Sequence, residues 1–164
     1  MKKIIWFVLI LLILFIGGIF YMTGLFGSRV FIVGKDIQKE DIQEFYYTIS
    51  SSTFPPEYQR YHFFIQDQKP YFYHEKREGE VFPLTEEYIT VSGKKELSEA
   101  EWNQFYQFIK DGEVIARQES ITSGDRGPFL YLYWKNDRSK IQQFSFGSYQ
   151  AMKDFEEYCI KLSQ

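Results

Sequence analysis

The stretch LSEAEWNQFYQFIKDG, residues 97–112, carries the clearest local structural signal of the chain. Ser98 and Glu101 have the spacing of a capping box: the serine side chain accepts from the glutamate amide, and the carboxylate reaches back to the serine amide. Apolar residues then recur at helical spacing on one face, at Trp102, Phe105, Tyr106 and Ile109. The stretch therefore predicts a helix over about 97–111.

Strand-like segments lie before this helix. Aromatic and β-branched residues predict strands at Phe45–Ile49, Tyr58–Gln66, Tyr71–Arg77, Val81–Leu84 and Tyr88–Val91. In this prediction a two-residue turn at Gln68–Lys69 joins the second strand to the third. The turn-type stretch Ser92–Lys95 ends the series.

The second half repeats this order with fewer strands. Strands are predicted at Val114–Ile121, Phe129–Trp134 and Lys140–Phe146, and Ser148 caps a second helix over about 148–162. Both faces of Phe129–Trp134 are apolar or aromatic, so this strand is expected at a central position of the sheet. Its more polar returning strand is expected nearer an edge. Antiparallel strands with two helices on one face define an α+β fold.

An uncharged apolar run precedes all of these elements, at residues 4–22. At about 1.5 Å per residue, a helix of this length covers most of the roughly 30 Å hydrocarbon core of a bilayer. Lys2 and Lys3 precede the run, which favours an amino terminus inside the cell and a carboxyl domain outside. The run is longer than the apolar region of a cleavable signal peptide, and neither a small-residue cleavage site nor a cysteine for lipid attachment follows it. The predicted organisation is a cytoplasmic stub and transmembrane signal anchor (1–28), a juxtamembrane linker (29–44) and an extracytoplasmic α+β domain (45–164).

Composition limits the function classes. Apart from Lys2 and Lys3 the chain carries 17 basic and 22 acidic side chains, so nucleic-acid binding is not expected. Cys159 is the single cysteine; it excludes an intramolecular disulfide and is expected to be a buried thiol on the last helix. The 17 Phe, 13 Tyr and 3 Trp are expected to fill the core and to pair across strands.

The loop Ser123–Pro128 is the one loop with features of a site. Its two glycines permit an anion-binding nest, although they equally suit a plain connection between strands. The strand that follows carries an aromatic row, which becomes the leading candidate surface for a ligand or partner if it is exposed. The candidate binding surface therefore comprises Asp125, Arg126, Phe129, Tyr131 and Tyr133.

Metal and carboxylate chemistry have less support. His62 and His74 fall on adjacent predicted strands, but the predicted turn pairs His62 with Glu75 and places the two imidazoles on opposite faces. No metal and no cofactor are therefore expected. The adjacent acids Glu86–Glu87 and Glu156–Glu157 point in different directions within each pair, so they are expected to be solvated charges.

The carboxyl-terminal part resembles a group of bacterial proteins. The segment Gly127–Trp134, then Gln143–Phe146 and the helix at Met152–Leu162, is similar to the end of small membrane-anchored or lipid-attached envelope proteins of Gram-positive bacteria. In that group a charged turn joins two aromatic strands and a helix ends the chain. The resemblance implies a setting in the bacterial cell envelope and carries no assigned activity.

The resulting interpretation is a non-enzymatic, single-pass interaction domain at the cell membrane. Its expected partners are the lipid bilayer, through residues 4–22, and an unidentified envelope or membrane protein. Two alternatives remain: an envelope hydrolase that uses carboxylates, and a small immunity or stress protein at the membrane surface. Converging carboxylates or a Ser–His pair in a deep pocket would favour the hydrolase, whereas a grooved surface with an apolar patch would favour the interaction domain.

Overall fold

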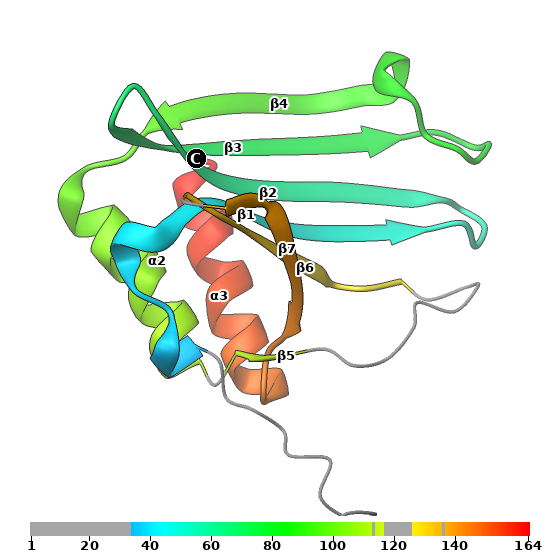
Figure 1. Ribbon diagram of the computed structural model, residues 1–164. Coiled ribbons are helices and arrows are strands. Elements are labelled where there is room, and N and C mark those ends of the chain that lie inside the picture. The colour runs from blue at the N-terminus through cyan, green and yellow to red at the C-terminus, as the bar shows by residue number, and fades with distance from the viewer. Residues whose placement is uncertain (1–33, 113, 117–125, 136) are drawn as a thin grey trace, which may run out of the picture. The chain divides into compact units, whose positions relative to one another are not determined.

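The protein has an α+β fold in which an antiparallel sheet carries two helices on one face (Figure 1). The computed structural model describes residues 34–112, 114–116, 126–135 and 137–164. Its elements in chain order are η1 (Gly34–Asp36), η2 (Lys39–Asp41), β1 (Ile42–Ser51), β2 (Glu57–Gln66), β3 (Lys69–Glu78), η3 (Glu86–Tyr88), β4 (Ile89–Glu96), α2 (Glu99–Asp111), β5 (Ile115–Ala116), β6 (Phe129–Trp134), β7 (Asp137–Ser145) and α3 (Tyr149–Leu162). The strand order is β4-β3-β2-β1-β6-β7-β5.

Both helices begin at the predicted caps. The Ser98 hydroxyl accepts from the Glu101 amide at 3.2 Å, and the Ser98 amide donates to the Glu101 carboxylate at 2.8 Å. Lys95 donates to the same carboxylate at 2.8 Å; this hydrogen bond and those from Ser98 lower the pKa of Glu101 to about 2. At the start of α3, the Ser148 hydroxyl accepts from the Ala151 amide at 3.1 Å. The capping box and both helix positions are thus confirmed.

The hydrophobic core lies between these helices and the covered face of the sheet. Phe63 of β2 stacks on Phe105 of α2 with ring centroids 4.1 Å apart, and Phe45 of β1 meets Phe155 of α3 edge-on at 5.9 Å. All four rings are fully buried. Cys159 is also fully buried, as predicted, and burial raises the pKa of its thiol. The aromatic residues on this face supply large buried areas, which a core without a disulfide requires.

Strand β6 is central, as predicted, because it pairs with β1 on one side and β7 on the other. Strand β7 lies next to the edge, where only the two-residue β5 follows it, and this position is also confirmed. Of the strand predicted at Val114–Ile121, the described part contains β5 alone.

The start of the folded domain differs from the prediction. Strand β1 begins at Ile42, and Ile37 is fully buried. The Gly34 amide donates to the Val114 carbonyl at 3.0 Å. The described part of the predicted linker 29–44 therefore belongs to the fold, because its apolar residues pack into the core. The predicted anchor 1–28 lies outside the described residues, and within the described part of the chain no helix is long and apolar enough to cross a membrane.

The β2–β3 turn is one residue earlier than predicted. Asp67 and Gln68 adopt positive φ angles of 51° and 64°, so Gln66 pairs with Lys69. Left-handed conformations at both central residues suit the right-handed twist of a two-residue hairpin, and aspartate tolerates them well. The turn was predicted one residue too late because proline is typical of turns, which favoured a turn next to Pro70. In the structure Pro70 lies inside β3.

The predicted strand Val81–Leu84 is wrong, and so is the predicted end of the series at Ser92–Lys95. Residues 81–84 form a loop, since Pro83 has no amide for a strand ladder. Strand β4 instead runs through Ser92–Lys95, because pairing with β3 overrides the turn-like composition of that stretch.

Candidate functional site

The face of the sheet opposite the two helices carries a second set of aromatic side chains. Side chains alternate between faces along a strand, so Phe45 and Tyr47 of β1 point to the helices and Tyr46 and Thr48 point away. We call the side without helices the open face. It presents Tyr46, Thr48 and Ser50 from β1; Tyr58, Arg60, His62 and Phe64 from β2; Tyr71, Tyr73, Glu75 and Arg77 from β3; and Phe129, Tyr131 and Tyr133 from β6.

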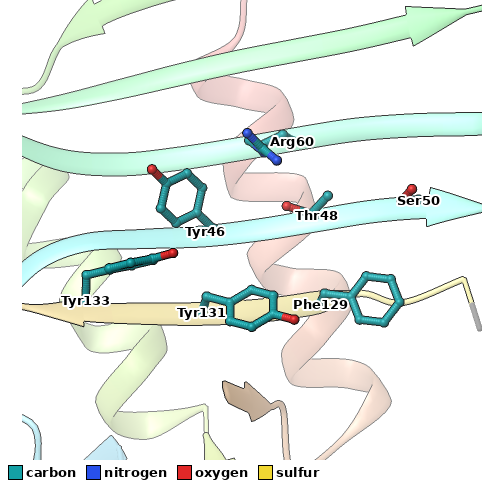
Figure 2. Close-up of a pocket in the computed structure, with 7 residues that line it drawn as sticks. All are labelled: Tyr46, Thr48, Ser50, Arg60, Phe129, Tyr131 and Tyr133. Carbon is teal, nitrogen blue, oxygen red and sulfur yellow. The ribbon is translucent and has the colours of Figure 1, made fainter. Parts of the chain in front are cut away.

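A concave hollow of about 530 Å³ lies on the open face over β1, β2 and β6 (Figure 2). Register explains its shape. Thr48 pairs with Arg60 on one side and with Phe129 on the other, so a short side chain lies between two long ones. The hollow is lined by Tyr46, Thr48, Ser50, Arg60, Phe129, Tyr131 and Tyr133.

Three of the five predicted surface residues line this hollow together. Phe129 is buried, while Tyr131 and Tyr133 are half-buried and contribute polar hydroxyls. The row is thus neither fully exposed nor closed by a helix, since neighbouring open-face side chains shield its rings. Its opposite face, at Leu130 and Leu132, is fully buried against the core.

The two loop residues of the predicted surface do not join the hollow. Asp125 lies outside the described residues. Arg126 is exposed and forms an ion pair with Glu57 at 2.6 Å, while its carbonyl accepts from the Ser50 amide at 3.1 Å. Gly127 has a φ of +90°, which a turn here requires. The described part of the loop therefore reads as a strand connection.

Tyr46 and His62 form a polar contact with Glu44 on the open face. Their rings stack with centroids 4.0 Å apart, and both reach the carboxylate of Glu44: the tyrosine hydroxyl donates at 2.6 Å, and the imidazole Nε2 lies at 2.9 Å. Burial lowers the pKa of His62 to about 4, against the opposing effect of Glu44. Burial, with Glu44, raises the pKa of Tyr46. At neutral pH both rings are therefore neutral, and Nε2 of His62 carries the proton donated to Glu44.

Arg60 is the charged residue of the hollow. Its guanidinium carbon lies 5.4 Å from the ring centre of Tyr46 and 5.3 Å from that of Tyr58. Its Nε is buried and has no hydrogen-bond partner among the described residues. Contact with two aromatic faces stabilises the guanidinium by cation–π attraction but satisfies none of its donors.

The carboxylate opposite Arg60 is already engaged. Glu75 pairs with Arg60 in the β2–β3 register, yet it accepts from Nε of Arg77 at 2.6 Å and from the Tyr73 hydroxyl at 3.0 Å. Both members of the Arg77–Glu75 pair are largely buried. Nε of Arg60 therefore has no hydrogen-bond partner within the described part of the chain.

Sequence reasoning missed the contributions of β1 and β2 to the hollow. Arg60 gave a signal, because it is an arginine inside an aromatic strand, between Gln59 and Tyr61. The sequence shows only that Tyr46, Thr48 and Ser50 share one face of a strand, because side chains alternate between faces. Which of these residues meet Tyr131 depends on the β1–β6 pairing, and these strands lie about eighty residues apart in the chain.

The two histidines lie on opposite faces, as predicted, although the register differs. His62 faces Tyr73 on the open face, whereas His74 faces Tyr61 on the helix side. His74 lies 3.1 Å from Nε2 of Gln59, and burial lowers its pKa. Among the described residues, no group of three or more His, Cys, Asp or Glu side chains could hold a metal ion.

The other candidate carboxylates are placed apart. Glu86 and Glu87 are exposed in η3, while Glu156 of α3 accepts a hydrogen bond from the buried Tyr47 hydroxyl. Burial, together with this hydrogen bond, raises the pKa of Tyr47. Glu156 thus has a structural partner in the core, and Glu157 beside it is exposed.

Comparison with protein-family models, with curated proteins and with solved structures found no match to this chain.

Proposed function

We propose that this protein is a single-pass binding domain held at the outer face of the cell membrane, which engages an envelope or membrane protein through the open face of its sheet. The observation that carries the proposal is the hollow. Its rings, hydroxyls and single arginine form a binding surface, and its described lining contains no carboxylate.

The composition of the open face supports a protein as the partner. Tyrosine and arginine are enriched at the energetic centres of protein interfaces, and tyrosine with serine dominates natural binding loops. A tyrosine ring supplies contact area at low cost in conformational entropy, and its hydroxyl adapts to polar partners. The aromatic surface also continues beyond the hollow, to Phe64 and Tyr71, whose rings stack at 5.5 Å.

The envelope location is supported by the amino-terminal sequence. Residues 4–22 are long and apolar enough for one membrane crossing, and Lys2 and Lys3 favour an inside amino terminus. The resemblance of the carboxyl-terminal part to envelope proteins of Gram-positive bacteria agrees with this location. The proposed partners are thus the lipid bilayer and a second protein that the anchored domain can reach.

A hydrolase with paired carboxylates gains no support from the hollow. The carboxylate nearest to it along β1, Glu44, is occupied by Tyr46 and His62. An acid and a base on opposite sides of a scissile bond would need two free carboxyl groups about 5–9.5 Å apart.

In-cell photocrosslinking tests the proposed function. A photoreactive phenylalanine replaces Tyr131 in the hollow or, as the matched control, Tyr149, an exposed tyrosine on α3. We expect a discrete protein adduct at position 131 that is absent at position 149, because only the first position faces the proposed partner. Identical adducts at both positions, or none at 131, would contradict the proposal.

The anchor has a separate test. Protease added outside wall-stripped cells should degrade the region from residue 29 to residue 164, and the mature protein should retain its first residues, Met1 or Lys2. A mature chain that begins after Ser28, or a protected carboxyl domain, would contradict the proposed topology while leaving the binding face untouched.

A further inference from the structure

We infer that the hollow receives a carboxylate side chain from an extended segment of the partner protein, and that Arg60 is the residue that binds it. This inference rests on the proposed function and names the chemistry that the partner must bring. Four observations carry it: an arginine whose buried Nε has no partner among the described residues, its fixed position, the trough-like shape of the hollow and its single charge.

The first observation is charge complementarity. Three arginines have described side chains, and two of them are paired: Arg77 with Glu75, and Arg126 with Glu57. Arg60 belongs to neither pair, and its buried Nε has no hydrogen-bond partner within the described part of the chain. A half-buried guanidinium without a partner is unfavourable unless a ligand completes it, because buried donors lose their hydrogen bonds to water.

The second observation is that Arg60 is held in place before any ligand arrives. It projects from the interior of β2 between two other strands, and the rings of Tyr46 and Tyr58 lie 5.4 and 5.3 Å from its guanidinium carbon. A guanidinium binds a carboxylate through two parallel hydrogen bonds, which requires a defined plane. The aromatic neighbours restrict that plane and so reduce the entropy lost on binding.

The third observation is the shape of the hollow. It follows β1, where Thr48 and Ser50 provide a low floor beneath taller aromatic side chains (Figure 2). Ser50 also lines a second hollow of about 180 Å³, so the two depressions adjoin. The other residues of the second hollow are Glu57, which is paired with Arg126, and Tyr58, Phe82, Pro83 and Leu84. From Tyr46 to Ser50, four residues of strand advance about 13 Å. A trough of this length suits an extended peptide of about four residues or more.

The fourth observation separates a carboxylate from a phosphate. Arg60 is the only cationic residue among the described residues that line the hollow. Lys94 of β4 is another cation of the open face, but it does not line the hollow. It donates to Gln66 at 2.7 Å and lies over the ring of Tyr71. Phosphate groups carry nearly two charges and are usually bound by clusters of arginines. One guanidinium matches one carboxylate.

The test uses the full-length protein in lipid nanodiscs and a phage library of random seven-residue peptides, with empty nanodiscs as background. The wild-type protein should enrich peptides that share an aspartate or glutamate at one position. A synthetic peptide from the enriched set is then compared with its Glu→Gln or Asp→Asn counterpart. The neutral counterpart should bind at least about tenfold more weakly, because truncating one side of a buried charge pair carries a large penalty.

Two variants complete the cycle. Arg60→Gln should lower the affinity for the acidic peptide by at least about tenfold and remove the preference for the acidic over the neutral peptide. Lys110→Gln makes the same charge change at an exposed position of α2, on the helix side of the sheet, and should leave both affinities unchanged within about twofold. If the Arg60→Gln variant does not fold, Arg60→Lys serves instead. Lysine keeps the charge but cannot form the bidentate contact, so this variant should bind the acidic peptide more weakly without a matching loss for the neutral peptide.

The outcomes separate this inference from the proposed function. Peptides that depend on Tyr131 but lack an acidic preference would overturn the carboxylate and leave the binding face intact. Displacement of the peptide by millimolar inorganic phosphate, with no Glu-over-Gln preference, would assign Arg60 to phosphate and overturn the inference. Failure to enrich any peptide, while position 131 still crosslinks in cells, would overturn the extended segment. Loss of both signals would remove the proposed function as well.

Discussion

The two faces of one sheet use aromatic residues in different ways. On β2, Phe63 points to the helices and is fully buried among Phe72, Phe105 and Phe155. Its chain neighbour Phe64 points to the open face and is half-buried beside His62. Most aromatic side chains on the covered face of the sheet are phenylalanines, whereas most of those on the open face are tyrosines. A hydroxyl is costly in a dry core but useful on a surface that binds, so the choice of ring reports the role of each face.

The largest expected effect compares these two neighbours. Phe63→Ala should lower the free energy of unfolding by about 3–5 kcal/mol, because it leaves a cavity inside the core. Phe64→Ala should lower it by only about 1 kcal/mol, the scale of a cross-strand pair on a half-exposed face. Urea unfolding of both variants, followed by tryptophan fluorescence, measures the difference.

The variants Phe63→Ala and Phe64→Ala can also contradict the proposed difference between the two faces. If the two variants lose equal stability, the open face is as much a part of the core as the helix side is, and a binding role for it loses its physical basis. Phe72→Ala is the control for position along the sheet, because Phe72 is the cross-strand partner of Phe63 and should resemble it.

The next effect is a pH dependence specific to the open face. Folding lowers the pKa of His62 from about 6.5 to about 4, chiefly through burial, while Glu44 opposes the change. The unfolded chain therefore binds a proton between these pH values that the folded chain does not. Stability should fall as the pH drops from about 6.5 to about 4, by about 3 kcal/mol in total.

Chemical unfolding across this pH range tests the prediction, with His62→Gln as the control. Glutamine does not titrate and keeps a donor for Glu44, so the difference between the two proteins isolates the histidine. The groups that face His62 are Glu44, Arg60, Tyr46, Phe64 and Tyr73. A constant difference between the variant and the wild type would show that His62 titrates as it does in water.

Features set by neighbouring residues, such as helix caps, could be predicted from the sequence. The positions of turns and strands depend on long-range pairing and were predicted less well. The helix at 97–111 was predictable because Ser98 and Glu101 interact within one turn of chain. The turn at Asp67–Gln68 was missed by one residue, since several polar residues there suit a turn and only the paired strands select among them. The region of Val81–Leu84 looked apolar enough for a strand, but Val81 is 67% exposed.

Only the β6 part of the candidate site could be predicted, because the other strands join it through long-range pairing. The row Phe129, Tyr131 and Tyr133 stands out within six consecutive residues, and its central position followed from having two apolar faces. Arg60 entered the site only through β1, which separates β2 from β6 in the sheet. A single sequence contains no record of that pairing, so the charged residue of the hollow had to come from the structure.

A smaller effect is expected at the cap of α2, on the covered side. Ser98→Ala should reduce the free energy of unfolding by about 1 kcal/mol, because the Glu101 amide loses its acceptor at the helix start. Ser148→Ala at the start of α3 is the matched variant and should have a similar effect. Thermal unfolding by circular dichroism resolves changes of this size. A negligible change in both would show that the caps define the helix ends without stabilising them.

The smallest effect on stability is expected at the residue with the proposed binding role. Arg60→Gln removes cation–π contacts with Tyr46 and Tyr58. It also removes a half-buried charge whose Nε has no partner among the described residues, and these two contributions to stability have opposite signs. The free energy of unfolding should therefore change by no more than about 0.5 kcal/mol. The same substitution at Arg77 should cost about 3 kcal/mol, because it leaves the buried carboxylate of Glu75 without its cation. Urea unfolding of the two variants, in the absence of any peptide, gives the contrast directly. A large loss of stability in Arg60→Gln would show that the arginine supports the fold, and the absence of a partner for its Nε among the described residues would then no longer indicate a ligand.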